Sequence, residues 1–109
     1  MKKIGRVFFR DTYAGKIEQA DGAYQFTYDP EYLDRVDSHP ISLTLPLRRD
    51  PYVEKTMIPF FDGLIPEGWL LNLAVKNWKI DRRDRMTLLL TLCEDCIGAV
   101  KIVNVSEEN

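Results

Sequence analysis

The sequence is poor in the residues that build metal and redox sites. It contains one histidine, His39, and two cysteines, Cys93 and Cys96, which form a single C-x-x-C. A tetrahedral zinc site needs four ligands, and neither a second cysteine pair nor a neighbouring histidine supplies the other two. We therefore interpret the cysteines as reduced residues near a helix end, at least one of them packed in the core. No metal or other cofactor is expected.

Long apolar runs are also missing. No segment approaches the roughly 20 consecutive apolar residues that a membrane-spanning helix needs. Arg6, Arg10 and Asp11 interrupt the apolar run near the N-terminus, and no small-residue cleavage site follows it, unlike in a signal peptide. We expect a cytoplasmic protein that does not contact a membrane.

Motifs for nucleotide chemistry are absent as well. The chain has neither G-x-x-x-x-G-K-[ST] nor G-x-G-x-x-G. Asp62-Gly63 follows two phenylalanines, but the catalytic-loop signature of a protein kinase is missing, so this chain alone cannot phosphorylate a substrate. His39 is interpreted as an ordinary surface or strand-end histidine rather than as a member of a catalytic triad.

Positive and negative side chains are nearly balanced in number. The formal net charge of −2 gives no overall attraction to a phosphate backbone, although it leaves room for a local basic patch. Arg82, Arg83 and Arg85 cluster, but two neighbouring aspartates dilute their charge and no aromatic residues alternate with them. We interpret this cluster as a solvated loop before a helix, and direct contact with nucleic acid is not expected.

What the chain does contain is the composition of one folded domain. Its 109 residues are 45% hydrophobic and 29% charged, which suits a single core. The first third predicts strands at residues 4–9, 16–18 and 24–28, separated by turns at residues 11–15 and at Asp21-Gly22. In the third strand a period of two places all three aromatic rings on one face, which we expect to point inward.

Prolines punctuate the middle of the chain. Residues 31–35 predict a helical turn after Asp29-Pro30. The segment I-S-L-T-L-P-L at residues 41–47 alternates and then meets a proline, which predicts a short edge strand followed by an exposed connection at residues 48–51. Residues 53–61 predict a helix that must begin near Pro59 or bend there.

The second half predicts helices and a closing strand. One helix begins at Pro66, with Glu67 favourable to its N-terminal dipole. Its apolar stripe consists of Trp69, Leu70, Leu73, Ala74 and Trp78. Asp81 or Asp84 caps a final helix, whose inward face carries Met86, Leu89, Leu90 and Cys93. Residues 98–105 predict a strand, and residues 106–109 form a polar tail.

These elements predict a fold class. Residues 1–109 form one small α+β domain with an N-terminal antiparallel sheet, about three helices in the second half and a C-terminal strand.

Aromatic residues gather in the stretch that contains Phe60, Phe61, Trp69 and Trp78. Core packing accounts for part of this set. Trp69 follows Gly68 in the first turn of its predicted helix, where side chains often stay partly exposed. Its apolar body and indole N–H donor suit an anchor that fills a pocket in a partner.

Five segments, in order, resemble the N-terminal subdomain of HipA-type toxin kinases. They are A-G-K-I at residues 14–17, F-T-Y-D at 26–29, P-I-S-L-T-L-P-L at 40–47, F-F-D-G-L-I-P-E-G at 60–68 and D-C-I-G-A-V at 95–100. The resemblance spans residues 4–104. The family's catalytic and ATP-binding residues lie in the kinase core that follows this subdomain, so none is carried over. The resemblance is nearest to the separate antitoxins, HipS, of split HipBST-type systems, in which the kinase lacks this subdomain.

The resemblance implies a function. This chain would be an antitoxin, not an enzyme, that inhibits a HipA- or HipT-like serine/threonine toxin kinase by docking where the fused subdomain would sit. A HipB-like DNA-binding protein belongs to such systems, which implies a ternary complex. We expect Trp69 to obstruct the active site, supported by Ile65, Pro66, Glu67 and Gly68.

Three alternatives stay open. The same docking could activate or stabilise a split kinase, because both outcomes need the same interface. A small independent enzyme could use aspartate, glutamate or His39, and a cleft of convergent carboxylates with perturbed pKa values would favour it. A nucleic-acid adaptor could work through Arg82, Arg83 and Arg85.

Overall fold

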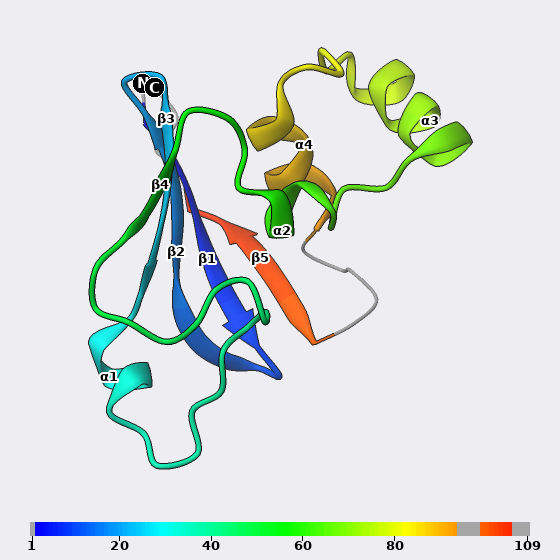
Figure 1. Cartoon of the computed structure of the whole chain (residues 1–109). Helices are drawn as coiled ribbons and strands as arrows, with labels where there is room; N and C mark the ends of the chain where they lie inside the picture. Colours follow the sequence, from blue (N-terminus) through cyan, green and yellow to red (C-terminus); the bar gives the residue numbers. More distant parts are fainter. Residues whose placement is uncertain (1, 94–98, 106–109) are drawn as a thin grey trace.

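The fold is built on one antiparallel sheet. The computed structural model describes residues 2–93 and 99–105. The strands of the sheet are β1 (Lys3–Phe9), β2 (Thr12–Ala20), β3 (Ala23–Tyr28), β4 (Tyr52–Glu54) and β5 (Val100–Asn104). Their order is β4-β3-β2-β1-β5, and each neighbouring pair is antiparallel (Figure 1). The helices of the described residues are α1 (Pro30–Leu33), α2 (Pro59–Asp62), α3 (Gly68–Trp78) and α4 (Arg85–Leu92).

This arrangement confirms the predicted α+β class, with three helices in the second half and a C-terminal strand. β5 does not extend the sheet beside β4 but pairs with β1, so the last strand lies next to the first. No helix of the described residues is both long enough and apolar enough to span a membrane.

Two tight turns connect the first three strands. The turn between β2 and β3 is at Asp21 and Gly22, both with positive φ, as the Asp-Gly signal predicts. The turn between β1 and β2 is shorter than the predicted one, because β2 begins at Thr12 and Gly15 lies within it. A Cβ atom on Gly15 would come 2.3 Å from the Thr27 carbonyl oxygen, so glycine is required there for close approach of β3 and not for a turn.

The predicted edge strand at residues 41–47 is wrong. This segment forms turns, and the buried Tyr28 hydroxyl holds it by donating to the Leu45 carbonyl oxygen and accepting from the Ile41 N–H at 3.1 Å. Burial raises the pKa of Tyr28 to about 12, so this hydroxyl stays protonated near neutral pH. The segment is thus attached through a side chain, not through a strand ladder.

The predicted helix over residues 53–61 is also wrong for most of its length. The true edge strand, β4, begins at Tyr52 and pairs with β3. Only the last turn is helical, in α2, which begins at Pro59. Proline lacks the N–H that a helix interior requires, and it is accepted at the first position.

The core lies between one face of the sheet and the helices α2 and α4. The aromatic face of β3 points inward as predicted: Phe26 and Tyr28 are buried, and Tyr24 packs at the edge of the core. The Phe26 and Phe61 ring centroids are 5.3 Å apart, which joins the sheet to α2. The remaining fully buried side chains include Val7, Ile17, Met86, Leu88, Leu89 and Ile102. Each contributes about 1.5–3 kcal/mol through removal from water.

Candidate functional site

The segment between α2 and α3 sets where α3 begins. Ile65 is 2% exposed and belongs to the core, so it anchors the segment to the domain. Gly68 has φ of 65°, a left-handed conformation that glycine adopts without cost. The predicted start at Pro66 is therefore two residues early, and Glu67 occupies the N-cap without a side-chain hydrogen bond.

The apolar face of α3 is largely uncovered by the domain. Trp69 is 73% exposed, and Trp78 is 58% exposed. Leu70 and Leu73 are 49% and 43% exposed. A typical surface helix turns its apolar stripe toward the core and its charged residues toward water. Here four large apolar side chains face the solvent, and we call them, together with the hollow beside them, the α3 surface.

Only a narrow part of α3 packs on the domain. Its buried residues are Leu71 and Ala74, and Figure 1 shows the helix beyond α2 and α4, away from the sheet. Successive residues of a helix are about 100° apart, so Trp69 and Leu73 lie on one side and Leu71 and Trp78 on the opposite side. Leu70 and Ala74 lie between them. The apolar arc is therefore wider than the contact with the domain.

A shallow hollow of about 310 Å³ lies beside this exposed face. Its lining is apolar apart from one amide, and it comprises Pro66, Leu70, Leu73, Ala74, Asn77, Trp78 and Leu92. Leu92, from the end of α4, closes one side. Exposed apolar patches with a concave part commonly mark protein–protein contact sites.

The predicted contact residues fall into two groups. Trp69 is exposed, and Pro66, Glu67 and Gly68 form the accessible segment just before it. Ile65 differs from the prediction that it contacts a partner. Its side chain is buried among core residues and is not available to a partner in this conformation. The helical stripe contained Leu70, Leu73 and Trp78, but periodicity alone does not distinguish a core-facing stripe from one that a partner covers.

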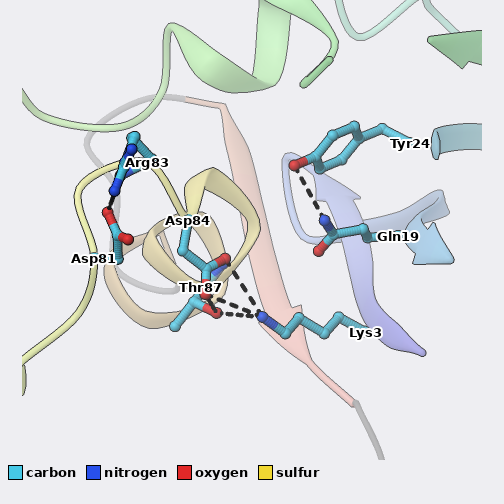
Figure 2. A network of polar contacts seen from close by, with 7 residues as sticks. All are labelled: Lys3, Gln19, Tyr24, Asp81, Arg83, Asp84 and Thr87. Carbon is cyan, nitrogen blue, oxygen red and sulfur yellow. Dashed lines mark hydrogen bonds and ion pairs between the residues drawn. The ribbon is translucent and has the colours of Figure 1, made fainter. Parts of the chain in front are cut away.

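The arginine cluster after α3 is engaged within the chain. Arg85 Nε lies 2.6 Å from Asp62 Oδ1 and joins the start of α4 to α2. Arg82 donates to the Asn72 side chain at 2.5 Å, and Arg83 pairs with Asp81 at 3.5 Å (Figure 2). These partners weaken the hypothesis of a nucleic-acid adaptor built on this cluster.

The first turn of α4 carries a polar network that also includes β1. Asp84 caps the helix, as one of the two predicted caps, by accepting from the Thr87 N–H at 3.2 Å. Lys3 Nζ reaches Asp84 Oδ2 at 3.2 Å and Thr87 Oγ1 at 2.7 Å (Figure 2). Burial alone would raise the pKa of Asp84, but the hydrogen bonds from Thr87 and Lys3 outweigh it and hold that pKa below its ordinary value.

The other shifted carboxylates are on the surface and have structural partners. The hydrogen bond and charge of Arg35 lower the pKa of Asp37, and the Arg83 backbone N–H lowers that of Asp81. A general acid near neutral pH needs a raised carboxyl pKa. The three lowered values, two of them just before α4 and one in the loop after α1, do not favour a carboxylate active site.

The remaining candidates for chemistry are ordinary in the described residues. His39 is exposed, and its carbonyl oxygen accepts from the Tyr32 hydroxyl at 2.5 Å. The thiol of Cys93 is buried and lies 3.5 Å from the Leu64 carbonyl oxygen, as a core cysteine would. Cys96 lies outside the described residues. Within residues 2–93 and 99–105, no three His, Cys, Asp or Glu side chains are grouped so that they could hold a metal ion.

Known proteins of similar sequence indicate the family of this chain. The family model described as the HipA N-terminal domain matches residues 5–103. An uncharacterized protein of Haemophilus influenzae is 33% identical over 100 residues, which cover 92% of this chain and 91% of that protein. A protein of Sinorhizobium fredii named putative kinase Y4mE is 29% identical over 107 residues, but these cover only 26% of its length.

A solved structure agrees with these sequence matches. It is described as the N-terminal domain of HipA toxin, and it superposes with a TM-score of 0.74 at 26% identity. The match covers 97% of this chain and 95% of that one. The resemblance that the five sequence segments indicate is thereby confirmed, and the chain belongs to the HipA N-terminal domain family.

Proposed function

We propose that this chain is an antitoxin that binds and inhibits a HipA- or HipT-like serine/threonine toxin kinase. The observation that carries the proposal is the α3 surface, an exposed apolar face on a domain of the HipA N-terminal family. Burying apolar area is the main driving force of protein association, and tryptophan is among the residues that most often dominate such interfaces.

The relatives support a place of docking. In the protein named putative kinase Y4mE, the matching domain makes up about a quarter of a longer chain. A domain of the same family on a separate chain can dock where the fused domain would sit. The α3 surface then faces the kinase, and a HipB-like DNA-binding protein completes a ternary complex.

The inhibitory step is assigned to Trp69. Its side chain projects from the first turn of α3, at the end of the segment formed by Pro66, Glu67 and Gly68. Ile65 holds this segment to the core, so the indole is presented from a fixed base. Obstruction of an active site by an inserted ring needs no catalytic residue in the inhibitor, in keeping with the absence of kinase motifs from the sequence.

An activating or stabilising accessory subunit is the second candidate. The family's domain occurs within a longer chain named as a kinase, which favours a role that supports the kinase. Inhibitor and activator use the same surface, so only the activity of the complex distinguishes them.

The experiment combines Trp69→Ala with a HipA-like kinase that co-purifies with this chain. Kinase autophosphorylation and complex formation are measured with the wild-type chain and with the variant. Loss of one tryptophan anchor is expected to cost about 2–4 kcal/mol of binding, or about a 30- to 1,000-fold rise in Kd, and to restore kinase activity.

The matched control is Leu43→Ala, which also truncates an exposed apolar side chain but lies in the loop after α1, outside the α3 surface. It should bind and inhibit as the wild type does. A folded Trp69→Ala chain that still inhibits fully would exclude Trp69 from the mechanism. A kinase that is more active with the wild-type chain than without it would replace the inhibitor with the activator.

A further inference from the structure

The face of the sheet opposite the core carries an unusual set of side chains. Along β1, Val7 points into the core, so Arg6 and Phe8 on either side of it point outward. On β5, Ile102 is buried and Lys101 points outward by the same alternation. We call this side of β1, β2 and β5 the outer sheet face.

A β-bulge brings Tyr13 to the outer sheet face. In the pairing of β1 with β2, Arg6 is opposite Lys16 and Val7 is opposite Gly15, but Phe8 is opposite Tyr13. The extra residue in β2 is Ala14, which shifts the alternation by one. Without this bulge Tyr13 would lie on the inward side with Gly15. The bulge therefore places two aromatic rings next to each other, with centroids 5.7 Å apart.

Cations lie over both rings. The Arg6 guanidinium is 4.6 Å from the Tyr13 ring centroid and 5.9 Å from that of Phe8. Lys101 Nζ is 5.3 Å from the Phe8 centroid, because the two residues are paired across β1 and β5. In the described part of the chain, no carboxylate lies within ion-pair distance of Arg6 or Lys101.

Cations line the middle of this face, and acidic residues lie at its margins. The neighbouring acid, Glu18, is already paired with Lys2 at 3.1 Å and with Lys16 at 3.6 Å. Lys2 and Lys16 thus share one carboxylate. Asp21 lines a hollow with Lys2 and Glu18, and Asp29 and Glu31 line another beside Tyr13. Since the Debye length is about 10 Å at 0.1 M salt, acidic residues on distant surfaces do little to cancel this local charge. A polyanion could therefore contact Arg6 and Lys101 without displacing an ion pair.

Although the net charge of the chain predicts no direct contact with nucleic acid, we propose that the outer sheet face binds single-stranded nucleic acid. Phosphates would pair with Arg6, Lys16 and Lys101, and exposed bases would stack on the aromatic rings or on the guanidinium plane above Tyr13. Flat rings and a guanidinium favour this ligand over an acidic protein segment, which would use the charges but not the planar surfaces. The inference rests neither on the α3 surface nor on the proposed inhibition of a kinase.

The chain supplies a matched control for this proposal. Arg82 and Arg83 are exposed, as Arg6 is, whereas Lys101 is half-buried. The two loop arginines lie before α4 and have polar partners in the chain. Arg6→Gln with Lys101→Gln therefore removes the same charge from the outer sheet face as Arg82→Gln with Arg83→Gln removes from the loop. Any difference between the two double variants reports location and not net charge.

The measurement is fluorescence anisotropy of labelled oligo-U and oligo-dT of about 15 nucleotides, with a duplex and a polyglutamate peptide as further probes. With three phosphates neutralised, affinity for single strands should fall about 20-fold between about 50 and about 200 mM salt. The Arg6/Lys101 double variant should weaken binding by about tenfold or more, whereas the Arg82/Arg83 double variant should stay within about twofold of the wild type.

Tyr13→Leu separates stacking from charge, because it keeps every cation and removes one ring. It should weaken oligonucleotide binding without changing the salt dependence.

Circular dichroism of each variant verifies the fold. No saturable binding of either oligonucleotide at low salt overturns the proposal, and so does an equal loss in both double variants. Equal affinity for the duplex overturns the single-strand preference, and equal affinity for polyglutamate assigns the face to an acidic protein. A difference between oligo-U and oligo-dT tells whether RNA or DNA is preferred.

Discussion

α4 buries four of its eight residues, whereas α3 buries only two of its eleven, although both helices are rich in apolar side chains. α4 lies against the sheet, and Leu88 and Leu89 are completely covered. α3 leaves two tryptophans and two leucines in the solvent. The apolar content of a helix therefore does not tell what covers it. The core of the domain is closed by α2 and α4, and the outward side of α3 is not part of it.

We expect the largest difference between the two helices in the free energy of unfolding. Leu89→Ala in α4 should lower the free energy of unfolding by about 2–5 kcal/mol, because it leaves a cavity in a packed core. Leu73→Ala in α3 should change it by no more than about 0.5 kcal/mol, since the side chain is already half in water. Urea denaturation followed by circular dichroism measures both. Equal losses would mean that α3 belongs to the core of the domain.

For binding to the kinase, we expect α3 to matter more than its small contribution to stability suggests. Leu73→Ala with Trp78→Ala should leave the stability of the free chain nearly unchanged and should weaken binding to the proposed kinase by about 2 kcal/mol or more. Isothermal titration calorimetry with the kinase measures this loss, and Leu43→Ala serves again as the exposed control. If the double variant binds as tightly as the wild type, the contact is limited to Trp69 and the segment before it.

Two parts of the fold show what the sequence could and could not predict. The Asp21-Gly22 hairpin and the Asp84 cap were predictable because each depends on residues within a few positions of it. The segment at residues 41–47 was not, because the Tyr28 hydroxyl that holds it comes from another strand. Its alternating pattern was typical of a strand, but the tertiary contact determined the structure.

At the candidate site, too, local sequence patterns predicted only part of the structure. Trp69 and Ile65 are four residues apart, both apolar and both in the segment that suggested a partner contact, yet one is exposed and the other is buried. Periodicity predicted the helix and its apolar stripe, but not which part of the stripe the domain leaves uncovered. That depends on how α2 and α4 fill the space over the sheet, which no local pattern contains.

A smaller effect compares the starts of the two helices. Asp84→Ala should cost about 0.5–2 kcal/mol because it removes the cap of α4. Glu67→Ala should cost less than about 0.5 kcal/mol, since Glu67 makes no side-chain cap bond at the start of α3. Urea titrations of both variants at neutral pH provide the comparison, and similar costs would contradict the structural difference.

The Asp84 cap also predicts a pH dependence. Its pKa in the folded chain is lower than in the unfolded chain, where it is about 3.9. Its contribution to stability is therefore complete above about pH 4 and is lost as pH falls through the lower, folded value. The stability difference between wild type and Asp84→Ala should shrink at acidic pH. A difference that stays constant to low pH would show that the carboxylate charge is not involved.

Contact between α3 and the kinase can be followed at the two tryptophans of the chain, both of which lie on α3. The chain is labelled with 5-fluorotryptophan, the two ¹⁹F resonances are assigned with Trp69→Phe and Trp78→Phe, and unlabelled kinase is added. A kinase that covers the α3 surface should shift and broaden both resonances, with the larger change at Trp69. Formation of a complex with both resonances unchanged would contradict binding at the α3 surface, because the kinase would then bind elsewhere on the domain.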